Sequence, residues 1–345
     1  MFWHPMLLAV MTADMMAILL ILSASKTAYD VLLSWSPESA DRKQLKLETA
    51  VEMSTIKVRA GAWTLFFSTS VLLMAISNTL PGIIPGAMCG KGVMQATGDM
   101  GNRALAFRFA AIFFLFLRTG LDKLDHTTPG ASLIQTNARL LLIALPLVFF
   151  STTNTFQSIA GLEVQAPVHC CAALYDSVRS TPKIFMGTHP PDAFWIAAFI
   201  TGSILMLASA FRMTLDAGFQ TGRKSMIGMI LCFLWAIVAA ITLVRVLSAY
   251  HYQVLYHHCP WCLFLDEHRL VGYPLFGALA AALFESTMAF AVARSGCKYP
   301  RLKLEASERI RKAGIRLMIA VSLFLMISAI PAVFWRIKYG VWIGG

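Results

Sequence analysis

The chain has 345 residues, of which 57% are hydrophobic and only 14% are charged, and its mean hydropathy is +0.66. This composition excludes an ordinary soluble protein, because a membrane-spanning helix needs about 20 mostly apolar residues and the chain offers several such runs. The formal net charge of +11 does not indicate nucleic-acid binding, because the basic residues flank the apolar runs.

Eight long apolar stretches follow one another along the chain. They lie near 6–25, 61–80, 104–120, 138–160, 193–211, 227–249, 271–293 and 314–334. They are too long and too uniformly apolar for the strands of a membrane barrel, so helices are the spanning structures that remain. We predict an all-α, polytopic membrane bundle of about eight transmembrane helices, with residues 1–345 forming a single integral membrane domain.

The distribution of lysine and arginine predicts the orientation of the bundle. The odd-numbered links between the stretches carry 20 of these residues, whereas the even-numbered links and the two termini carry seven. Cytoplasmic loops accumulate Lys and Arg, so we expect both termini outside, in a bacterial-type inner (plasma) membrane. The loops that contain most of the cysteines then face the periplasm or an equivalent compartment.

The first two helices carry their own signals. The segment before the first stretch has no Lys or Arg, so we expect a transmembrane helix and not a signal peptide, with Asp14 packed inside the bundle. Ser36-Pro37-Glu38 is typical of a helix start. The second helix is therefore expected to extend into the cytoplasm from about residue 37.

Three even-numbered links carry cysteines, which are therefore expected on one side of the membrane. The link 81–103 is rich in glycine and carries Cys89, which suggests a loop folded tightly around that thiol. A later link carries Cys170 and Cys171, and a third carries Cys259-Pro260-Trp261-Cys262. We expect the five cysteines of these links to converge in one outer pocket.

The motif Cys259-Pro260-Trp261-Cys262 has three possible interpretations. At a helix start the thiols of such a motif are stabilised as thiolates, the attacking species in disulfide exchange. The same spacing also suits metal ligation or a structural disulfide. His257 and His258 precede the motif, and protonated imidazoles there would further favour thiolates.

This motif at the outer end of a membrane helix, with further thiols in other outer loops, resembles the bacterial disulfide-forming membrane oxidoreductases and the vitamin K epoxide reductases. The resemblance implies electron transfer between protein thiols and a bound quinone, with Cys259 and Cys262 as the pair near the quinone. It covers only these residues and the general placement of the other outer cysteines, and those proteins have about four helices where this chain has eight.

Soft-metal binding is the alternative reading of the same loops. Seven of the eight histidines fall on the outer side or at its boundary, and His169 and His258 are each followed by a cysteine. Met88 precedes Cys89. Thiolate, thioether and imidazole ligands together suit copper or zinc, so His169, His257, His258 and Met88 are candidate ligands.

Ionisable residues inside spans are costly and often functional. Arg108 and Arg245 lie in the outer halves of their stretches, where they could bind a quinone beneath the thiol loops. The alternative for Arg108 is an ion pair inside the bundle, for example with Asp14.

We therefore expect a membrane thiol–disulfide redox protein that exchanges electrons with a carrier such as quinone. The alternative is a non-catalytic subunit or assembly factor of a larger membrane complex that binds copper or zinc. In either case the partners are membrane lipids and a protein on the outer face or within the complex.

Overall fold

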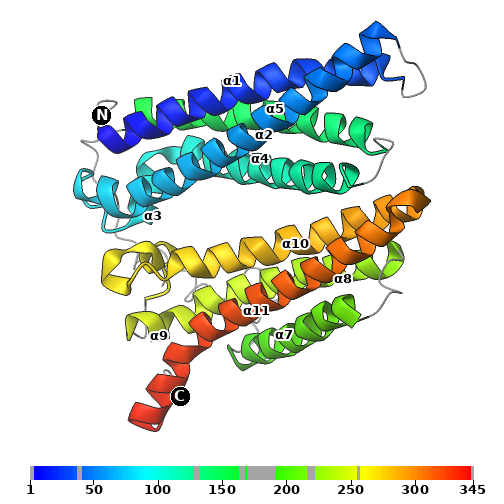
Figure 1. The fold of residues 1–345 in the computed structure, drawn as a ribbon. Coiled ribbons are helices and arrows are strands. Elements are labelled where there is room, and N and C mark those ends of the chain that lie inside the picture. The colour runs from blue at the N-terminus through cyan, green and yellow to red at the C-terminus, as the bar shows by residue number, and fades with distance from the viewer. Residues whose placement is uncertain are drawn as a thin grey trace, which may run out of the picture. The chain divides into compact units, whose positions relative to one another are not determined.

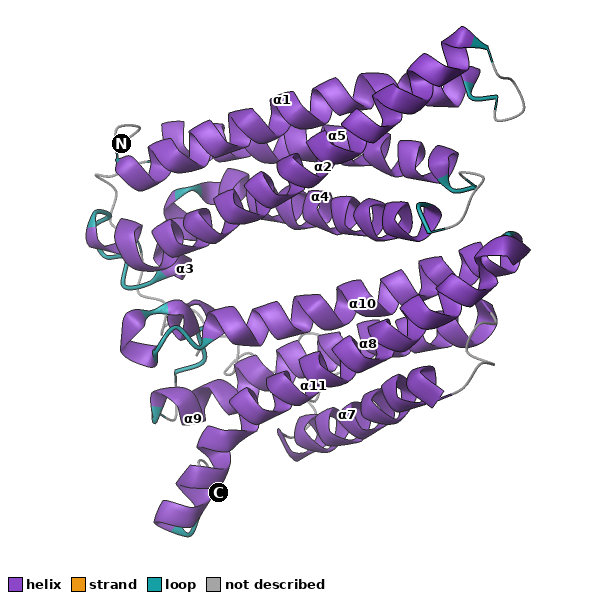
Figure 2. Ribbon diagram, in the orientation of Figure 1, coloured by secondary structure: helices purple, strands orange, loops and turns teal. Residues whose placement is uncertain are grey.

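The computed structural model describes residues 4–36, 41–127, 132–162, 168, 192–215, 222–254 and 257–342. These residues are mostly helical, and none of them forms a strand (Figures 1 and 2). Among the described residues, eight helices are long and apolar enough to cross a membrane, and each contains or overlaps one of the eight predicted stretches. The prediction of an all-α, polytopic membrane bundle is confirmed.

The chain divides into two compact units. Unit 1 comprises Met1–Ala75, Met94–Glu163 and Arg294–Ala306, and unit 2 comprises Ile76–Val93, Val164–Ala293 and Ser307–Gly345. The expectation of a single domain over the whole chain stays a prediction.

Unit 1 is built on four long helices. They are α1 (Pro5–Ser34), α2 (Arg42–Met74), α4 (Gly98–Asp125) and α5 (Ile134–Ala160). Helix α1 packs on α2 and α5, and α4 packs on α5 and α2. Ile21, Leu65, Leu115 and Leu141 are fully buried where the helices meet.

One buried ion pair crosses the interior of unit 1. The guanidinium of Arg108 on α4 pairs with the carboxylate of Asp14 on α1, and both side chains are almost completely buried. Arg108 Nη1 also donates to Ser68 Oγ at 2.9 Å, and Nη2 donates to Thr155 Oγ1 at 3.1 Å. Asp14 therefore packs inside the bundle as predicted, and one residue from each of the four helices joins this network.

Unit 2 contains the remaining long helices. They are α7 (Asp192–Leu215), α8 (Gly222–Thr242), α10 (Gly272–Lys298) and α11 (Lys303–Tyr339), of which unit 2 takes α10 up to Ala293 and α11 from Ser307. Trp235 on α8 donates to Ser203 on α7 at 2.9 Å and packs edge-on against Phe324 of α11. Glu285 on α10 accepts hydrogen bonds from Arg309 and Arg316 on α11, at 2.9 and 3.0 Å.

Two helices end in π-helical turns that the sequence did not predict. Helix α2 continues into η1 (Ala75–Thr79) and then the 3-10 turn η2 (Leu80–Gly82). Helix α8 continues into η4 (Leu243–Leu247) and α9 (Ser248–Tyr252). Wide turns of this kind occur frequently at functional sites, and both of these precede loops that carry cysteines.

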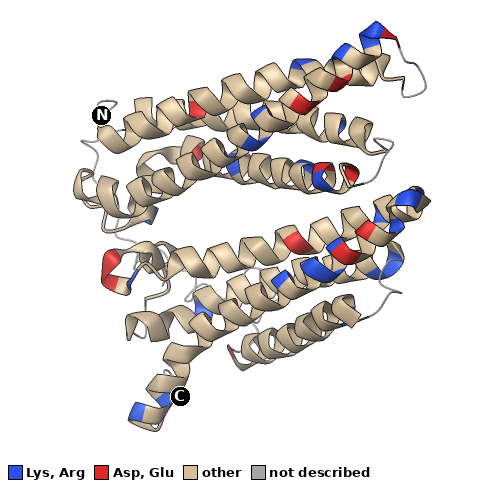
Figure 3. Ribbon diagram, in the orientation of Figure 1, with Lys and Arg blue, Asp and Glu red and all other residues tan. Residues whose placement is uncertain are grey.

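The outer faces of the helices are apolar, as a lipid-exposed surface requires. Large hydrophobic side chains such as Leu19, Trp63, Phe67 and Ile204 are each more than 60% exposed. The span Arg42–Gly82 has 41 residues. At 1.5 Å per residue it is about 60 Å long, twice the roughly 30 Å of a bilayer core. Figure 3 shows Lys and Arg gathered on the first half of α2, so that charged half extends beyond the bilayer core. The helix start expected from about residue 37 falls on residues 37–40, outside the described part.

Candidate thiol site

The first part of the site is the turn that carries Cys89, between η2 and the short helix α3 (Gly90–Ala96). Gly86 adopts a left-handed conformation, with φ of 79°, which glycine reaches without steric cost. The carbonyl of Cys89 accepts hydrogen bonds from the N–H groups of Gly92 and Val93, which start α3. Cys89 thus lies at the start of a short helix, and its side chain is completely buried.

The second part is the motif Cys259-Pro260-Trp261-Cys262. Cys259 precedes the 3-10 helix η5 (Pro260–Phe264), whose first residue is Pro260, and Cys262 N–H donates to the Cys259 carbonyl at 3.2 Å. The expected helix start is present, but this helix has only five residues. Its dipole is accordingly weak, so the electrostatic stabilisation of thiolates expected from a long helix does not apply.

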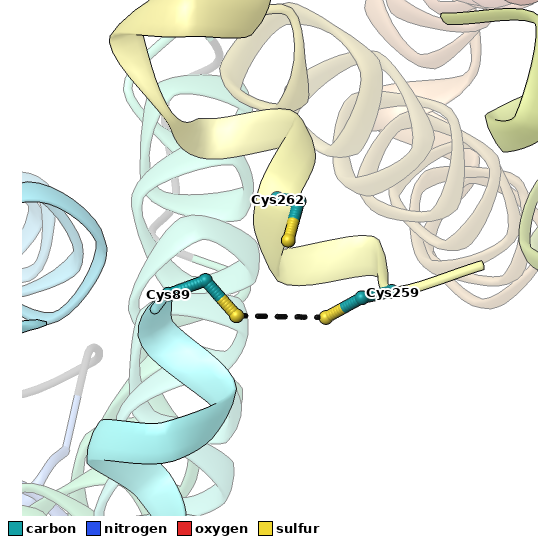
Figure 4. A group of neighbouring side chains, drawn as sticks. All are labelled: Cys89, Cys259 and Cys262. Atoms are coloured by element: carbon teal, nitrogen blue, oxygen red, sulfur yellow. Dashed lines mark hydrogen bonds between the residues drawn. The ribbon is translucent and has the colours of Figure 1, made fainter. Parts of the chain in front are cut away.

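The three described cysteines of the outer links meet in unit 2. The sulfur atoms of Cys89, Cys259 and Cys262 all lie within 4.8 Å of one another. The Cys89 and Cys259 sulfurs are 3.7 Å apart, and Figure 4 shows these two side chains pointing toward each other. The exposed fractions are 0%, 0% and 6%, respectively, so the cluster is shielded from solvent.

Close packing between the two thiol-bearing segments holds the cluster together. A Cβ atom added to Gly90 would lie 2.4 Å from Cε3 of Trp261. The residue after Cys89 must therefore be glycine, because the indole of the second motif occupies the space of any side chain there. The contact fixes Cys89 beside Cys259 although 170 positions separate them in the sequence.

Hydrogen bonds brace the motif from the neighbouring elements. Asn78 of η1 donates to the Phe264 carbonyl at 3.3 Å, and the hydroxyls of Ser77 and Tyr273 are 3.1 Å apart. The ring of Phe264 stacks on Phe276 of α10, with centroids 5.3 Å apart. The π-helical turn thus contacts both the end of η5, through Asn78, and the start of α10, through Ser77.

Tyr252 is a site residue that the sequence analysis missed. Its hydroxyl donates to the Cys259 carbonyl, and its ring packs edge-on against His257 and His268, with centroids 4.5 and 4.6 Å away. Partial burial lowers the pKa of His268, and the nearby His257 adds to this effect while Glu267 opposes it. A tyrosine at the end of an apolar run resembles an ordinary interfacial residue, so its role could not be inferred from sequence.

The other predicted residues have different placements. His169, Cys170 and Cys171 lie outside the described residues. His258 is buried and Met88 is 68% exposed, whereas His257 is half-buried. The group of candidate ligand atoms within 4.8 Å of one another consists of the three thiols and, in the described part of the chain, includes no histidine.

The two arginines considered for quinone binding both have carboxylate partners. Arg108 belongs to unit 1, where Asp14 accounts for its burial by the predicted alternative of an ion pair. Arg245 lies in η4 of unit 2, and its Nε is 3.6 Å from Oδ1 of Asp192. These contacts account for both charges without a ligand, and a quinone role for either residue stays a prediction.

Comparison of the chain with protein-family models, with curated proteins and with solved structures gives no match. The chemistry of the site therefore has to be argued from its own atoms. Three neighbouring thiols can exchange a disulfide bond among themselves or can together bind a thiophilic metal ion.

Proposed function

We propose that the protein is an integral membrane thiol–disulfide redox protein whose reactive groups are Cys259, Cys262 and Cys89. The single observation that carries this proposal is the 3.7 Å separation of the Cys89 and Cys259 sulfurs, directly beside a C-x-x-C pair. An S–S bond is about 2.05 Å long. A small side-chain movement would therefore allow a disulfide bond between Cys259 and Cys89. The sulfur of Cys262 is also within 4.8 Å of both.

The proposed chemistry is a two-electron exchange. Oxidation of the Cys259 and Cys262 thiols forms one S–S bond and releases two protons and two electrons. A membrane quinone that takes up the two electrons and the two protons becomes a quinol. The Cys89 thiolate can then attack the Cys259 sulfur, which forms a Cys89–Cys259 bond and releases Cys262 as a thiolate. The disulfide moves within the cluster with no net change in oxidation state.

The burial of the cluster favours a membrane carrier as the direct electron acceptor. A folded protein substrate cannot reach sulfurs that are 0–6% exposed. The motif also resembles that of the membrane thiol–quinone oxidoreductases. The asymmetry of Lys and Arg supports a site at the outer face of a bacterial-type inner membrane, where disulfides persist.

Soft-metal binding is the second candidate, and it rests on the mutual proximity of all three sulfurs. With Zn–S bonds of about 2.3 Å, two sulfurs of a tetrahedral site are about 3.8 Å apart. The observed 3.7 Å is close to that spacing. Three thiolates would suit Cu(I) or Zn(II), and the protein would then be a metal-binding subunit or assembly factor of a membrane complex.

Thiol counting in the purified full-length protein distinguishes the two candidates. The protein is equilibrated in glutathione buffers of graded potential, quenched, denatured and labelled with a mass-tagged maleimide. We expect a transition that changes the label count by two and disappears in Cys259→Ser, because Cys259 takes part in both proposed disulfide bonds. Cys232→Ser is the matched control, because Cys232 is equally buried but lies on α8 outside the cluster.

A different outcome of the thiol count would contradict the redox proposal. A label count that stays constant at all potentials, with about one equivalent of copper or zinc lost in Cys262→Ser, would replace the redox proposal with the metal one.

A further inference from the structure

A cavity of 420 Å³ is lined by residues of unit 1, whereas the three thiols belong to unit 2. It is bordered by the C-terminal parts of α1 and α4 and the N-terminal parts of α2 and α5. Its volume falls in the range of about 300–1,000 Å³ that is typical of small-molecule sites. The lining combines apolar residues such as Val31 and Ile134 with eight polar ones, namely Thr27, Glu52, Ser54, Arg118, Asp122, Asp125, His126 and Asn137.

Two buried side chains of this lining have polar atoms without partners. Arg118 is 4% exposed, and its Nε and Nη1 have no hydrogen-bond partner among the described residues. Asn137 is 5% exposed, and the same holds for its side-chain oxygen. Buried donors and acceptors are almost always satisfied in folded proteins. A ligand in the cavity that both side chains border would satisfy them.

The charges around the cavity indicate which charged groups the ligand should have. Asp122 is already engaged, since it accepts hydrogen bonds from Arg59 at 2.9 Å and Thr55 at 3.1 Å. Asp125 accepts the Leu133 N–H at 2.9 Å through one oxygen. The remaining ionisable groups of the lining are the guanidinium of Arg118, the imidazole of His126 and the carboxylates of Asp125 and Glu52. A simple anion would face two carboxylates and a simple cation would face Arg118, so a zwitterion fits best.

The position of the cavity along the helices indicates the source of such a ligand. Helix α4 has 28 residues. That makes it about 42 Å long, against roughly 30 Å for the bilayer core. The charged residues Arg118, Asp122, Lys123 and Asp125 follow its apolar run, so we expect this end of the helix at the headgroup region. Pockets between transmembrane helices with basic side chains can bind lipid phosphate groups at this depth.

We propose that this cavity binds an ammonium–phosphate zwitterion, the headgroup chemistry of phosphatidylethanolamine. The phosphate accepts from Arg118 Nε and Nη1, and the ammonium donates to Asp125, Glu52 and the side-chain oxygen of Asn137. The inference is independent of the thiol chemistry, because every residue that it uses belongs to unit 1.

Native mass spectrometry of the delipidated, full-length protein tests the proposal. Phosphatidylethanolamine, phosphatidylcholine and phosphatidylglycerol with identical acyl chains are added one at a time. We expect the ethanolamine lipid to bind roughly tenfold more tightly than the other two. Choline has no N–H groups to donate, and glycerol has no positive charge. A parallel arm uses soluble O-phosphoethanolamine, so that binding without acyl chains identifies a free metabolite as the source of the same chemistry.

Variants assign the binding to this cavity. Glu52→Gln changes an exposed side chain and should leave the fold intact while it reduces the preference for ethanolamine over choline. Arg118→Lys keeps the charge but loses the planar pair of donors, and should weaken binding of all phosphate ligands. Lys123→Gln is the matched control, since Lys123 is exposed on the same helix and does not line the cavity. Equal retention of the three lipids without binding of phosphoethanolamine, or unchanged binding in Glu52→Gln and Arg118→Lys, would overturn the proposal.

Discussion

At the scale of single residues, the contacts of a buried ionisable side chain show whether its charge is balanced within the protein or would need a ligand. Arg108 and Arg118 lie on the same helix and are similarly buried. The guanidinium of Arg108 is paired with Asp14, whereas Arg118 lines a cavity and two of its donor atoms have no partner among the described residues. Position in a span therefore does not distinguish a structural arginine from one with a binding role, but the surrounding atoms do.

Removal of one partner of the buried ion pair should strongly destabilise unit 1. Asp14→Ala leaves the Arg108 charge uncompensated in the interior, and we expect a loss of about 3–5 kcal/mol in the free energy of unfolding. The measurement is thermal or denaturant unfolding in detergent. Asp99→Ala is the control, because Asp99 forms an exposed pair with Arg103 on the same helix, and such pairs contribute little. Equal stability of the two variants would show that the buried pair does not stabilise the bundle.

The lowered pKa of His268 predicts a pH dependence of stability near the thiol site. Because burial favours the neutral imidazole, the folded protein binds this proton only below the ordinary histidine pKa of about 6.5. The unfolded chain binds it first, so the folded state loses stability as the pH falls from about 6.5 through the lowered pKa. Melting temperatures across this window should fall less in His268→Gln than in the unchanged protein. An identical pH profile for the two proteins would contradict this assignment.

At the scale of elements, the packing of two short segments creates the thiol site. Helix α3 was not predicted, because a seven-residue helix among glycines has no periodic apolar pattern. The π-helical turn η1 was likewise unexpected, because it depends on tertiary contacts such as that between Asn78 and Phe264. The glycines around Cys89 did signal a tightly folded loop, and the contact of Gly90 with Trp261 is its physical basis.

The Gly90 contact gives a prediction for the packing of these two segments. Gly90→Ala would force a methyl group into the Trp261 ring, at a cost of about 1–3 kcal/mol, and would displace Cys89 from Cys259. Gly82→Ala is the matched control in the same segment, because an added Cβ there meets no atom within 4 Å. The maleimide reactivity of Cys89 in the native protein should rise in Gly90→Ala and stay low in Gly82→Ala. Low reactivity in both variants would mean that this contact does not hold the loop.

At the scale of the whole molecule, the long apolar runs predicted the fold, whereas the orientation inferred from the charge distribution stays a prediction. All eight spans were found because about 20 apolar residues in succession have few alternatives to crossing a membrane. The charged turns Arg42–Arg59, which continue α2 beyond its apolar run, agree with the predicted extension of this helix, although α2 begins at Arg42. The cavity of unit 1 was missed because Arg118 was counted only as a marker of the cytoplasmic side. Arg118, Asp122 and Asp125 share one face of α4, and that spacing was the available signal.

Sidedness is testable with Cys297, which is exposed near the end of α10. In intact cells an impermeant maleimide should not label a variant whose sole cysteine is Cys297, but should label it after permeabilisation. A cysteine-free variant with Glu267→Cys, an exposed position near the thiol site, should be labelled without permeabilisation. Labelling of Cys297 in intact cells would invert the proposed orientation.

The central claim is that Cys89 and Cys259 exchange a disulfide, and the most direct measurement is to trap that bond. In a background with Cys170, Cys171 and Cys262 replaced by serine, mild oxidation followed by protease digestion and mass spectrometry should recover a peptide that links Cys89 to Cys259. The same background with Cys89→Ser should give no linked peptide. If Cys89 and Cys259 remain unlinked after oxidation, although both thiols are labelled once the protein is denatured, the account of this site as a thiol redox centre is wrong.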